Sequence, residues 1–263
     1  MAQDVDDPVG DAIAIDASSN LAAKAMQPLG RMVVLAILAG AFIAFGSIAS
    51  LIVQAAAGDA GPVRLLSGIA FSVGLFLVMI VGAELFTGNT MFALPAYKGD
   101  LTFARMLGAW GTVWFGNLLG GVTVAILFSA SGSLDAEIGS AAVSVAQDKL
   151  AKAPHAIFFS GILANMLVCL AVWMAMSART LPAKAVAVVA PVSIFVAAGL
   201  EHSIANMSLL PLGWLAAPLE TPDFAAGLIN IALSTLGNIV GGVLLVFAMA
   251  YGHDALRAEG AQR

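Results

Sequence analysis

Residues 199–206 read GLEHSIAN and place a glutamate, a histidine and an asparagine inside a long apolar run, 185–210. Ionisable groups at membrane depth are costly, so they are rare and usually face a cavity or a pathway. A second stretch, GAELFTGN at residues 82–89, has the same frame, with a glycine two positions before the glutamate and an asparagine five after it. We expect the chain to be organised around these two stretches, only one of which carries a histidine.

Two glycine-rich stretches extend the pattern. Residues 116–121 read GNLLGG and residues 237–242 read GNIVGG. Two matched pairs in the same order predict an internal duplication. The glycines have the small-xxx-small spacing that lets helices approach closely, here the third and sixth apolar segments, within or between protomers. Asn117 and Asn238 are expected to bond the interrupted helices across that contact.

The composition is that of an integral membrane protein. The chain has 263 residues, of which 60% are hydrophobic and 10% are charged, whereas soluble domains are roughly 45–50% apolar and about 25% charged. Cys169 is the single cysteine, so no internal disulfide forms, and the three histidines are too far apart for a metal-ligand motif. We expect no metal and no cofactor. The acidic stretch up to Asp16 lacks the features of a signal peptide and indicates a solvated segment.

Hydropathy predicts six apolar segments, near 31–54, 65–96, 106–130, 155–177, 185–210 and 226–251. The second is too long for one straight span and is predicted to break near 84–90, and the fifth near 199–208. Irregular backbone at membrane depth is tolerated only where protein or a water-filled cavity satisfies its polar groups. Two breaks at matching positions of two halves indicate a permeation site.

The basic residues predict the orientation, because they are enriched on the cytoplasmic side. Of the 11 lysines and arginines, only Arg64, Lys149 and Lys152 fall on the side away from the termini. We therefore predict a bacterial inner-membrane protein with cytoplasmic tails at 1–28 and 253–263. The pore domain, 29–252, is predicted to be all-α, with six transmembrane helices in two inverted repeats of three, about 29–130 and 155–252. The loop 131–154 is expected outside, with a short helix.

His202 is the leading candidate for the pore centre. Histidine can be charged or neutral near physiological pH, with an ordinary pKa of about 6.5, so it can attract an anion and lend it a proton. The alternative is a packed histidine bonded to nearby backbone. Thr87, in the matching stretch, is expected to bond the histidine or the permeant species, unless it merely caps a helix end. Asn165 is either a packing residue or a partner of His202.

The remaining polar candidates have structural and functional interpretations. Glu84 and Glu201 are expected to stabilise the breaks by bonding loop amides or a helix N-terminus, although proton relay is the alternative. Asn89 and Asn206 are expected to do likewise. Charged residues at the outer mouth could draw anions in or simply lie in a solvated loop; they are Lys149 and Lys152.

Apolar residues near the breaks are either core or gate. Phe71 and Leu75 share a helix face before the first break, and Phe195 precedes the second. Because the two broken segments enter from opposite sides, Phe71 is expected nearer the outside and Phe195 nearer the inside. Because these aromatic residues flank the only histidine at membrane depth, we favour the interpretation that they form a gate.

Three stretches resemble the formate/nitrite transporter family: GAELFTGNTMF at 82–92, GILANMLVCLAVWM at 161–174 and GLEHSIANM at 199–207. The resemblance covers roughly residues 20–252 and is closer to the nitrite-channel branch, which residues 208–214 and the short loop 211–225 also favour. It implies a homopentamer with an aquaporin-like protomer and one pore in each. It further implies that Asn165 is a polar neighbour of the histidine and that six residues form two constrictions: Phe71, Leu75, Leu85, Phe86, Val168 and Phe195.

The sequence thus predicts a non-enzymatic channel for small monovalent anions, with nitrite first and formate or hydrosulfide as further cargo. The alternative from another class is an aquaporin-like pore for neutral solutes. Two Asn-Pro-Ala repeats would favour that alternative, but the corresponding positions, 89–91 and 206–208, read NTM and NMS. A membrane enzyme is disfavoured because no nucleophile, metal set or cofactor motif accompanies His202 and Glu201.

Overall fold

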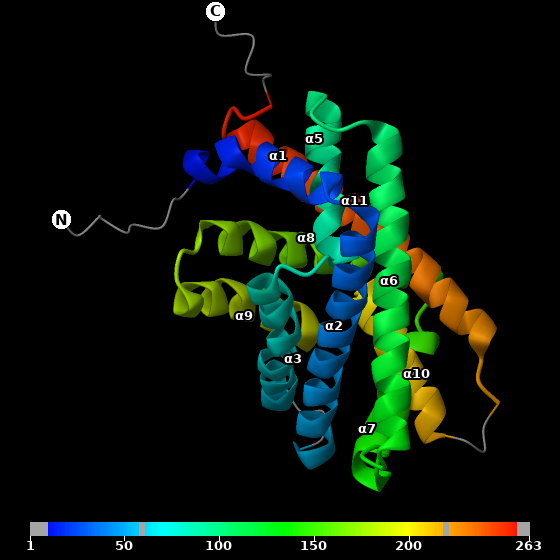
Figure 1. Ribbon diagram of the computed structural model, residues 1–263. Helices are drawn as coiled ribbons and strands as arrows, with labels where there is room; N and C mark the ends of the chain where they lie inside the picture. The colour runs from blue at the N-terminus through cyan, green and yellow to red at the C-terminus, as the bar shows by residue number, and fades with distance from the viewer. Residues whose placement is uncertain (1–9, 58–60, 218–220, 257–263) are drawn as a thin grey trace, which may run out of the picture.

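The computed structural model describes residues 10–57, 61–217 and 221–256, and these ranges are helical without any strand (Figure 1). Five helices are long and apolar enough to cross a membrane: α2 (Leu29–Ala57), α3 (Gly61–Val81), α6 (Phe103–Ala130), α8 (Pro154–Ser177) and α11 (Phe224–Gly252). The shorter elements are α1 (Asp11–Met26), α4 (Phe86–Asn89), η1 (Thr90–Phe92), α5 (Ala93–Lys98), α7 (Ala136–Leu150), α9 (Leu181–Ala197) and α10 (Ser203–Ala216). The predicted all-helical class is confirmed.

Both predicted interruptions are present. The chain leaves helical geometry between α3 and α4 and again between α9 and α10. Gly82 and Gly199 follow the ends of α3 and α9 closely and have φ angles of 70° and 63°. Glycine adopts these left-handed values without the strain that a Cβ introduces. The shared glycine of the two sequence frames therefore ends each helix and starts each break.

The glycine-rich stretches bring helix backbones together, as expected, but their partners are α2 and α8 of the same chain. α6 packs along α2, and α11 packs along α8. A Cβ added at Gly120 would overlap the carbonyl oxygen of Ile37, and one added at Gly241 would overlap that of Ile162. These two seams leave no room for a side chain at either glycine.

We expect Gly120→Ala to lower the stability of the protein, because the added methyl group forces α2 away from α6. Overpacking of this kind costs about 1–3 kcal/mol. The matched control is Gly108→Ala on the same helix, where no described atom lies within 4 Å of the added carbon and alanine is the better helix former. Thermal unfolding in detergent compares them, and equal stability of the two variants would contradict the seam.

The N-terminal segment differs from its prediction. Residues 11–26 form α1 instead of a solvated tail, while residues 1–9 lie outside the described ranges. One face of α1 is buried, at Ala14, Ala17, Leu21 and Ala25. Arg105 donates to the carbonyl oxygens of Ala25 at 2.9 Å and Gln27 at 2.7 Å, which fixes the end of the helix. Small residues at helical spacing form this narrow apolar face. The prediction missed it because the acidic residues nearby made the segment look solvated.

The two ends of the molecule carry different short helices. In Figure 1, α1 and α5 lie at one end and α7 lies at the opposite end. α7 is the short helix predicted within the loop 131–154, and it packs against α10 and α2. Below, the two ends are called the α1 end and the α7 end.

Candidate pore site

Asn117 holds the break between α3 and α4. Its Nδ2 donates to the carbonyl oxygens of Glu84 at 2.9 Å and Ala36 at 2.7 Å, and its Oδ1 accepts from the amide of Phe86 at 2.9 Å. The side chain is fully buried. Buried backbone groups need partners, and here one amide side chain on α6 supplies them to a non-helical segment.

Asn238 does the same for the break between α9 and α10. Its Nδ2 donates to the carbonyl oxygens of Glu201 at 3.0 Å and Gly161 at 2.8 Å, and its Oδ1 accepts from the amide of Ser203 at 2.9 Å. The expected bond from each asparagine to an interrupted helix is therefore confirmed. The two breaks are closed by the same set of donors and acceptors.

The carboxylate of Glu84 lies toward the α1 end. It accepts from Asn89 Nδ2 at 2.8 Å and Gln27 Nε2 at 2.8 Å, and it lies 3.5 Å from Lys24 Nζ. Gln27 and Lys24 were not singled out in the sequence, because their relevance depends on α1 folding back over the break. Their spacing of three residues, which puts side chains on one helix face, was the available signal.

The carboxylate of Glu201 lies toward the α7 end and is fully buried. It accepts from Asn206 Nδ2 at 2.6 Å and forms ion pairs with Lys149 at 3.3 Å and Lys152 at 2.6 Å. Both lysines, expected at a mouth or in a solvated loop, thus bind the break through this carboxylate. Glu84 and Glu201 thus have equivalent partners. Each carboxylate accepts from the asparagine five residues later and pairs with a lysine of a short helix, α1 or α7. These contacts agree with the expected role of stabilising the breaks.

His202 and Thr87 come together from the two breaks. The distance between His202 Nε2 and Thr87 Oγ1 is 3.0 Å, and both residues are buried. Thr87 lies in α4, just past the first break, and His202 immediately precedes α10. The predicted meeting of the two matched stretches is present in this hydrogen bond.

The hydrogen-bond pattern assigns the tautomer of His202. The amide of Ala205 donates to Nδ1 at 3.0 Å, so Nδ1 is an acceptor and carries no proton. A neutral imidazole then carries its proton on Nε2, which donates to the hydroxyl oxygen of Thr87. The hydroxyl hydrogen of Thr87 is left to donate to another acceptor. His202 is also the N-cap of α10, so the bond to nearby backbone that was the alternative for this residue is present together with the bond to Thr87.

Thr87 is held by three groups that donate to its carbonyl oxygen. They are Thr90 Oγ1 at 2.6 Å, Asn165 Nδ2 at 3.1 Å and Cys169 Sγ at 3.4 Å. Of the two interpretations of Asn165, its contacts favour packing, since its Nδ2 bonds Thr87, Thr90 and Asn238 and none of its described bonds reaches His202. Cys169, read as filler, belongs to the same clamp, and only the three-dimensional contact reveals this.

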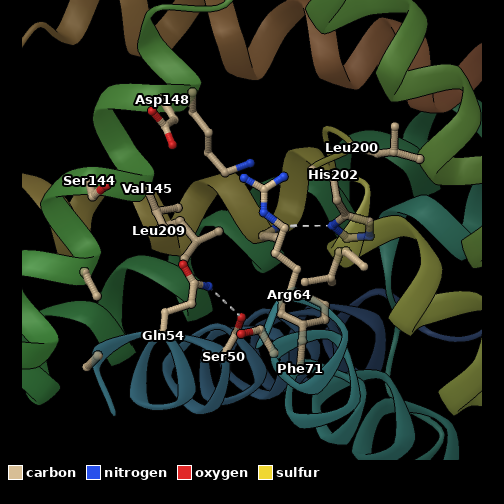
Figure 2. Close-up of a pocket in the computed structure, with 18 of the residues that line it drawn as sticks. Ser50, Gln54, Arg64, Phe71, Ser144, Val145, Asp148, Leu200, His202 and Leu209 are labelled. Carbon is tan, nitrogen blue, oxygen red and sulfur yellow. Dashed lines mark hydrogen bonds between the residues drawn. The ribbon is translucent and has the colours of Figure 1, made fainter. Parts of the chain in front are cut away.

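A cavity of about 980 Å³ opens toward the α7 end. It is lined by residues of α2, α3, α7, α9 and α10, and His202 lies in its wall. Figure 2 shows Arg64 reaching into this cavity, with Phe71 beside it and His202 and Asp148 around it. Of the predicted site residues, the cavity lining includes Phe71, Lys149, Lys152, Phe195, Glu201 and His202.

The two aromatic rings of the cavity lie on one side of the histidine, which corrects the prediction that they flank it. The Phe195 ring stacks on the imidazole of His202 at 5.6 Å with an interplanar angle of 19°, and it meets the Phe71 ring edge-on, also at 5.6 Å. α9 packs along α3 and ends close to Glu201, whose carboxylate points to the α7 end. Phe195 therefore reaches the same cavity as Phe71.

The other predicted constriction residues lie elsewhere. Leu75, Leu85, Phe86 and Val168 are buried, and none of them is among the described residues that line the cavity. The ring of Phe86 packs edge-on against Trp110 at 6.4 Å. A second constriction at these four residues stays a prediction.

We expect Thr87→Val to reduce anion flux by about tenfold or more, since it removes the one hydroxyl that links the breaks. A hydrogen bond to a charged group contributes about 1.5–3 kcal/mol, and 1.4 kcal/mol is about tenfold. Thr87→Ser keeps the hydroxyl and serves as the control. Flux into proteoliposomes measures both, and equal loss in the two variants would show that the hydroxyl is not what matters.

The fold and site define a helical membrane protein with a buried polar pair between two interrupted helices. A formate/nitrite transporter family model matches residues 11–252. The chain is 37% identical to the formate channel FocA of Escherichia coli (strain K12), over 81% of this chain and 82% of that protein. It is also 37% identical to the nitrite transporter NirC of the same strain, over 85% and 83%. A solved pentameric formate channel with formate bound matches with a TM-score of 0.79 and 34% identity, over 87% of this chain and 98% of that chain.

The chain belongs to the formate/nitrite transporter family, a family of membrane channels and transporters. The family resemblance drawn from the sequence is confirmed. The leaning toward the nitrite branch is not resolved, because the formate channel and the nitrite transporter are equally similar to this chain, at 37% identity.

Proposed function

We propose that the chain conducts small monovalent anions across the bacterial inner membrane, with nitrite first and formate and hydrosulfide as further cargo. The observation that carries the proposal is the bond between His202 and Thr87 at the inner end of the cavity. Two similar proteins are a formate channel and a nitrite transporter, and both of these cargoes are small anions with oxygen acceptors.

In the proposed path, an anion collects in the cavity at the α7 end and passes the rings of Phe71 and Phe195. It then meets the imidazole of His202 and the free hydroxyl hydrogen of Thr87. An anion leaving water needs donors that replace its hydration, and these two groups supply them where the rings exclude water. It leaves toward the α1 end past a second constriction, which we assign to Leu75, Leu85, Phe86 and Val168.

The tautomer of His202 decides what the histidine gives the anion. With Nδ1 occupied by the Ala205 amide, the ring is neutral and polarises the anion through its Nε2 proton. Donation of a proton to the anion requires a cationic ring, so a second proton must first displace the Ala205 amide from Nδ1. The cationic ring would then give its Nε2 proton to the anion and keep the proton on Nδ1, the neutral acid would carry the transferred proton across, and that proton would return to Nε2 from the receiving side.

We further propose that the chain crosses the membrane six times, as two inverted repeats of three helices, with both termini cytoplasmic. The supporting observation is that Asn117 and Asn238 make the same bonds to the two breaks. In this arrangement α9 and α10 together form the fifth crossing, and the α7 end faces outward. The similar solved channel is pentameric, so we propose a homopentamer for this chain.

Flux measurements on one preparation test the proposed function. Proteoliposomes are loaded and assayed with nitrite, formate and hydrosulfide, and their osmotic shrinkage with water and glycerol is followed in parallel. Nitrite flux well above protein-free liposomes, without a matching rise in water or glycerol permeability, is expected. Rapid neutral-solute flux without anion flux would overturn the proposal in favour of an aquaporin-like pore.

A further inference from the structure

The two breaks allow the surroundings of Thr87 to be compared with those of its counterpart, because both breaks are closed by the same bonds. Asn117 donates to the carbonyl oxygen of Ala36 on α2, and Asn238 donates to that of Gly161 on α8. Ala36 and Gly161 are therefore equivalent positions. Side chains that the fold needs to close a break are expected at both breaks, whereas side chains that serve transport can be present at one.

The donors to the carbonyl oxygen of Thr87 are present at one break only. Three side chains supply them: Thr90, Asn165 and Cys169. Counted along the chain from Ala36 and Gly161 and from the two break asparagines, their counterparts carry no hydroxyl, amide or thiol group; these counterparts are Met207, Gly40 and Ala44. The carboxylates and asparagines that close the breaks, in contrast, are present at both. The fold therefore closes a break without such donors.

Thr90 makes the shortest of the three bonds. Its Oγ1 donates to the carbonyl oxygen of Thr87 at 2.6 Å, compared with 3.1 Å from Asn165 Nδ2 and 3.4 Å from Cys169 Sγ. The two hydrogens of Asn165 Nδ2 are divided among three acceptors, which are the carbonyl oxygens of Thr87 and Asn238 and the hydroxyl oxygen of Thr90. A thiol is a weak donor. Among these three groups, Thr90 therefore contributes most to holding Thr87.

Helix α11 leaves space for the hydroxyl of Thr90. This residue is fully buried, and a Cβ added at Gly242 would overlap its Oγ1. Gly121 is the matching glycine on α6, and a Cβ added there would lie 3.5 Å from the carbonyl oxygen of Met207, which is an ordinary contact distance. The close fit around the Thr90 hydroxyl is therefore also confined to one break.

We infer that Thr90 is a positioning residue, whose hydroxyl holds the backbone of Thr87 so that the Thr87 hydroxyl stays within hydrogen-bonding distance of His202. The inference rests on the proposed function and deepens it, because Thr90 acts on the anion only through Thr87. The four residues of α4 are too few for a helix to be stable by its own backbone bonds, so contacts with neighbouring groups fix its place. Thr87 Oγ1 lies 3.0 Å from His202 Nε2, and a shift of about 0.5 Å brings this pair to the limit of hydrogen bonding.

The test removes the Thr90 hydroxyl in the presence and in the absence of the Thr87 hydroxyl. Thr90→Val is expected to lower nitrite and formate flux in proteoliposomes about fivefold, the effect of one hydrogen bond, and Thr90→Ser is expected to keep the wild-type flux. In the Thr87→Val background, Thr90→Val is expected to cause no further loss, because the hydroxyl that it positions is already gone. The control is Ser234→Ala, which removes another buried hydroxyl that bonds a carbonyl oxygen three residues earlier and is expected to leave flux unchanged.

Three flux results would overturn the inference while leaving the proposed function intact. They are wild-type flux in Thr90→Val, a loss in Thr90→Ser equal to that in Thr90→Val, and the same fold-loss from Thr90→Val in both backgrounds, which would show a general structural role. Absence of anion flux in the wild type would instead overturn the proposed function.

A structural measurement decides the inference independently of flux. Cryo-electron microscopy of the wild type and of Thr90→Val is expected to show Thr87 Oγ1 and His202 Nε2 beyond hydrogen-bonding distance in the variant alone. An unchanged distance would overturn the inference. Thr90→Ala, whose side chain is smaller, provides a second variant for both measurements.

Discussion

Replacing His202 with asparagine is expected to lower nitrite flux by about a hundredfold in proteoliposomes. The variant removes the Nε2 donor that faces Thr87. A charge-assisted hydrogen bond of about 3 kcal/mol corresponds to about a hundredfold in rate. The Thr87 hydroxyl then has to serve the anion alone.

The asparagine variant separates transport from folding. His202 caps α10 by accepting from the amide of Ala205, and asparagine is among the best N-cap residues, so the start of α10 is kept. His202→Phe removes both the donor and the cap and is expected to show the same flux loss with about 1 kcal/mol lower stability. Both variants are expected to assemble like the wild type by size-exclusion chromatography. Undiminished nitrite flux in either would refute the role of His202.

Replacing Asn238 with leucine is expected to abolish the folded protein. Leucine has a similar size but leaves the Ser203 amide and the carbonyl oxygens of Glu201 and Gly161 without their partner. Each buried polar group that loses its bond costs about 1–3 kcal/mol, so three of them cost about 3 kcal/mol or more, a large part of the total stability of a typical domain.

The matched control lies on the same helix. Leu236→Ala removes more atoms than Asn238→Leu changes. Because Leu236 is 53% exposed, this control variant is nevertheless expected to fold. The yield of monodisperse protein in detergent and its thermal unfolding compare the two variants. If Asn238→Leu unfolds at the same temperature as the control, the break does not depend on this asparagine.

Much of the fold follows from local sequence rules. The breaks near 84–90 and 199–208 were predicted from polar residues inside two long apolar segments, and the structure shows that the glycine of each repeated frame, with its positive φ, follows the end of the preceding helix. α1 was missed because its buried face consists of alanines and one leucine amid acidic residues. Its burial depends on contacts with η1, α5 and α6, which no short sequence window contains.

The sequence predicted which residues form the centre of the site, but not on which side of His202 each aromatic ring lies. His202 and Thr87 were paired from the matching frames, and the structure brings them within 3.0 Å. The sidedness of Phe195 was wrong, because hydropathy gives the limits of a segment and not the depth at which it breaks. Cys169 gave no signal in the sequence, since the role of a cysteine in an apolar helix depends on the atom that it faces, here the carbonyl oxygen of Thr87.

The glycine seams at Gly120 and Gly241 limit how this protein can change shape. At these two glycines α6 packs against the backbone of α2 and α11 against the backbone of α8, with no space for even a methyl group between them. Collective helix movements take about microseconds to milliseconds, whereas side-chain rotations are faster. Under the proposed function we therefore expect the rings of Phe71 and Phe195, and not these helices, to move when an anion passes, so transport is expected to survive chemical cross-links between α2 and α6 and between α8 and α11.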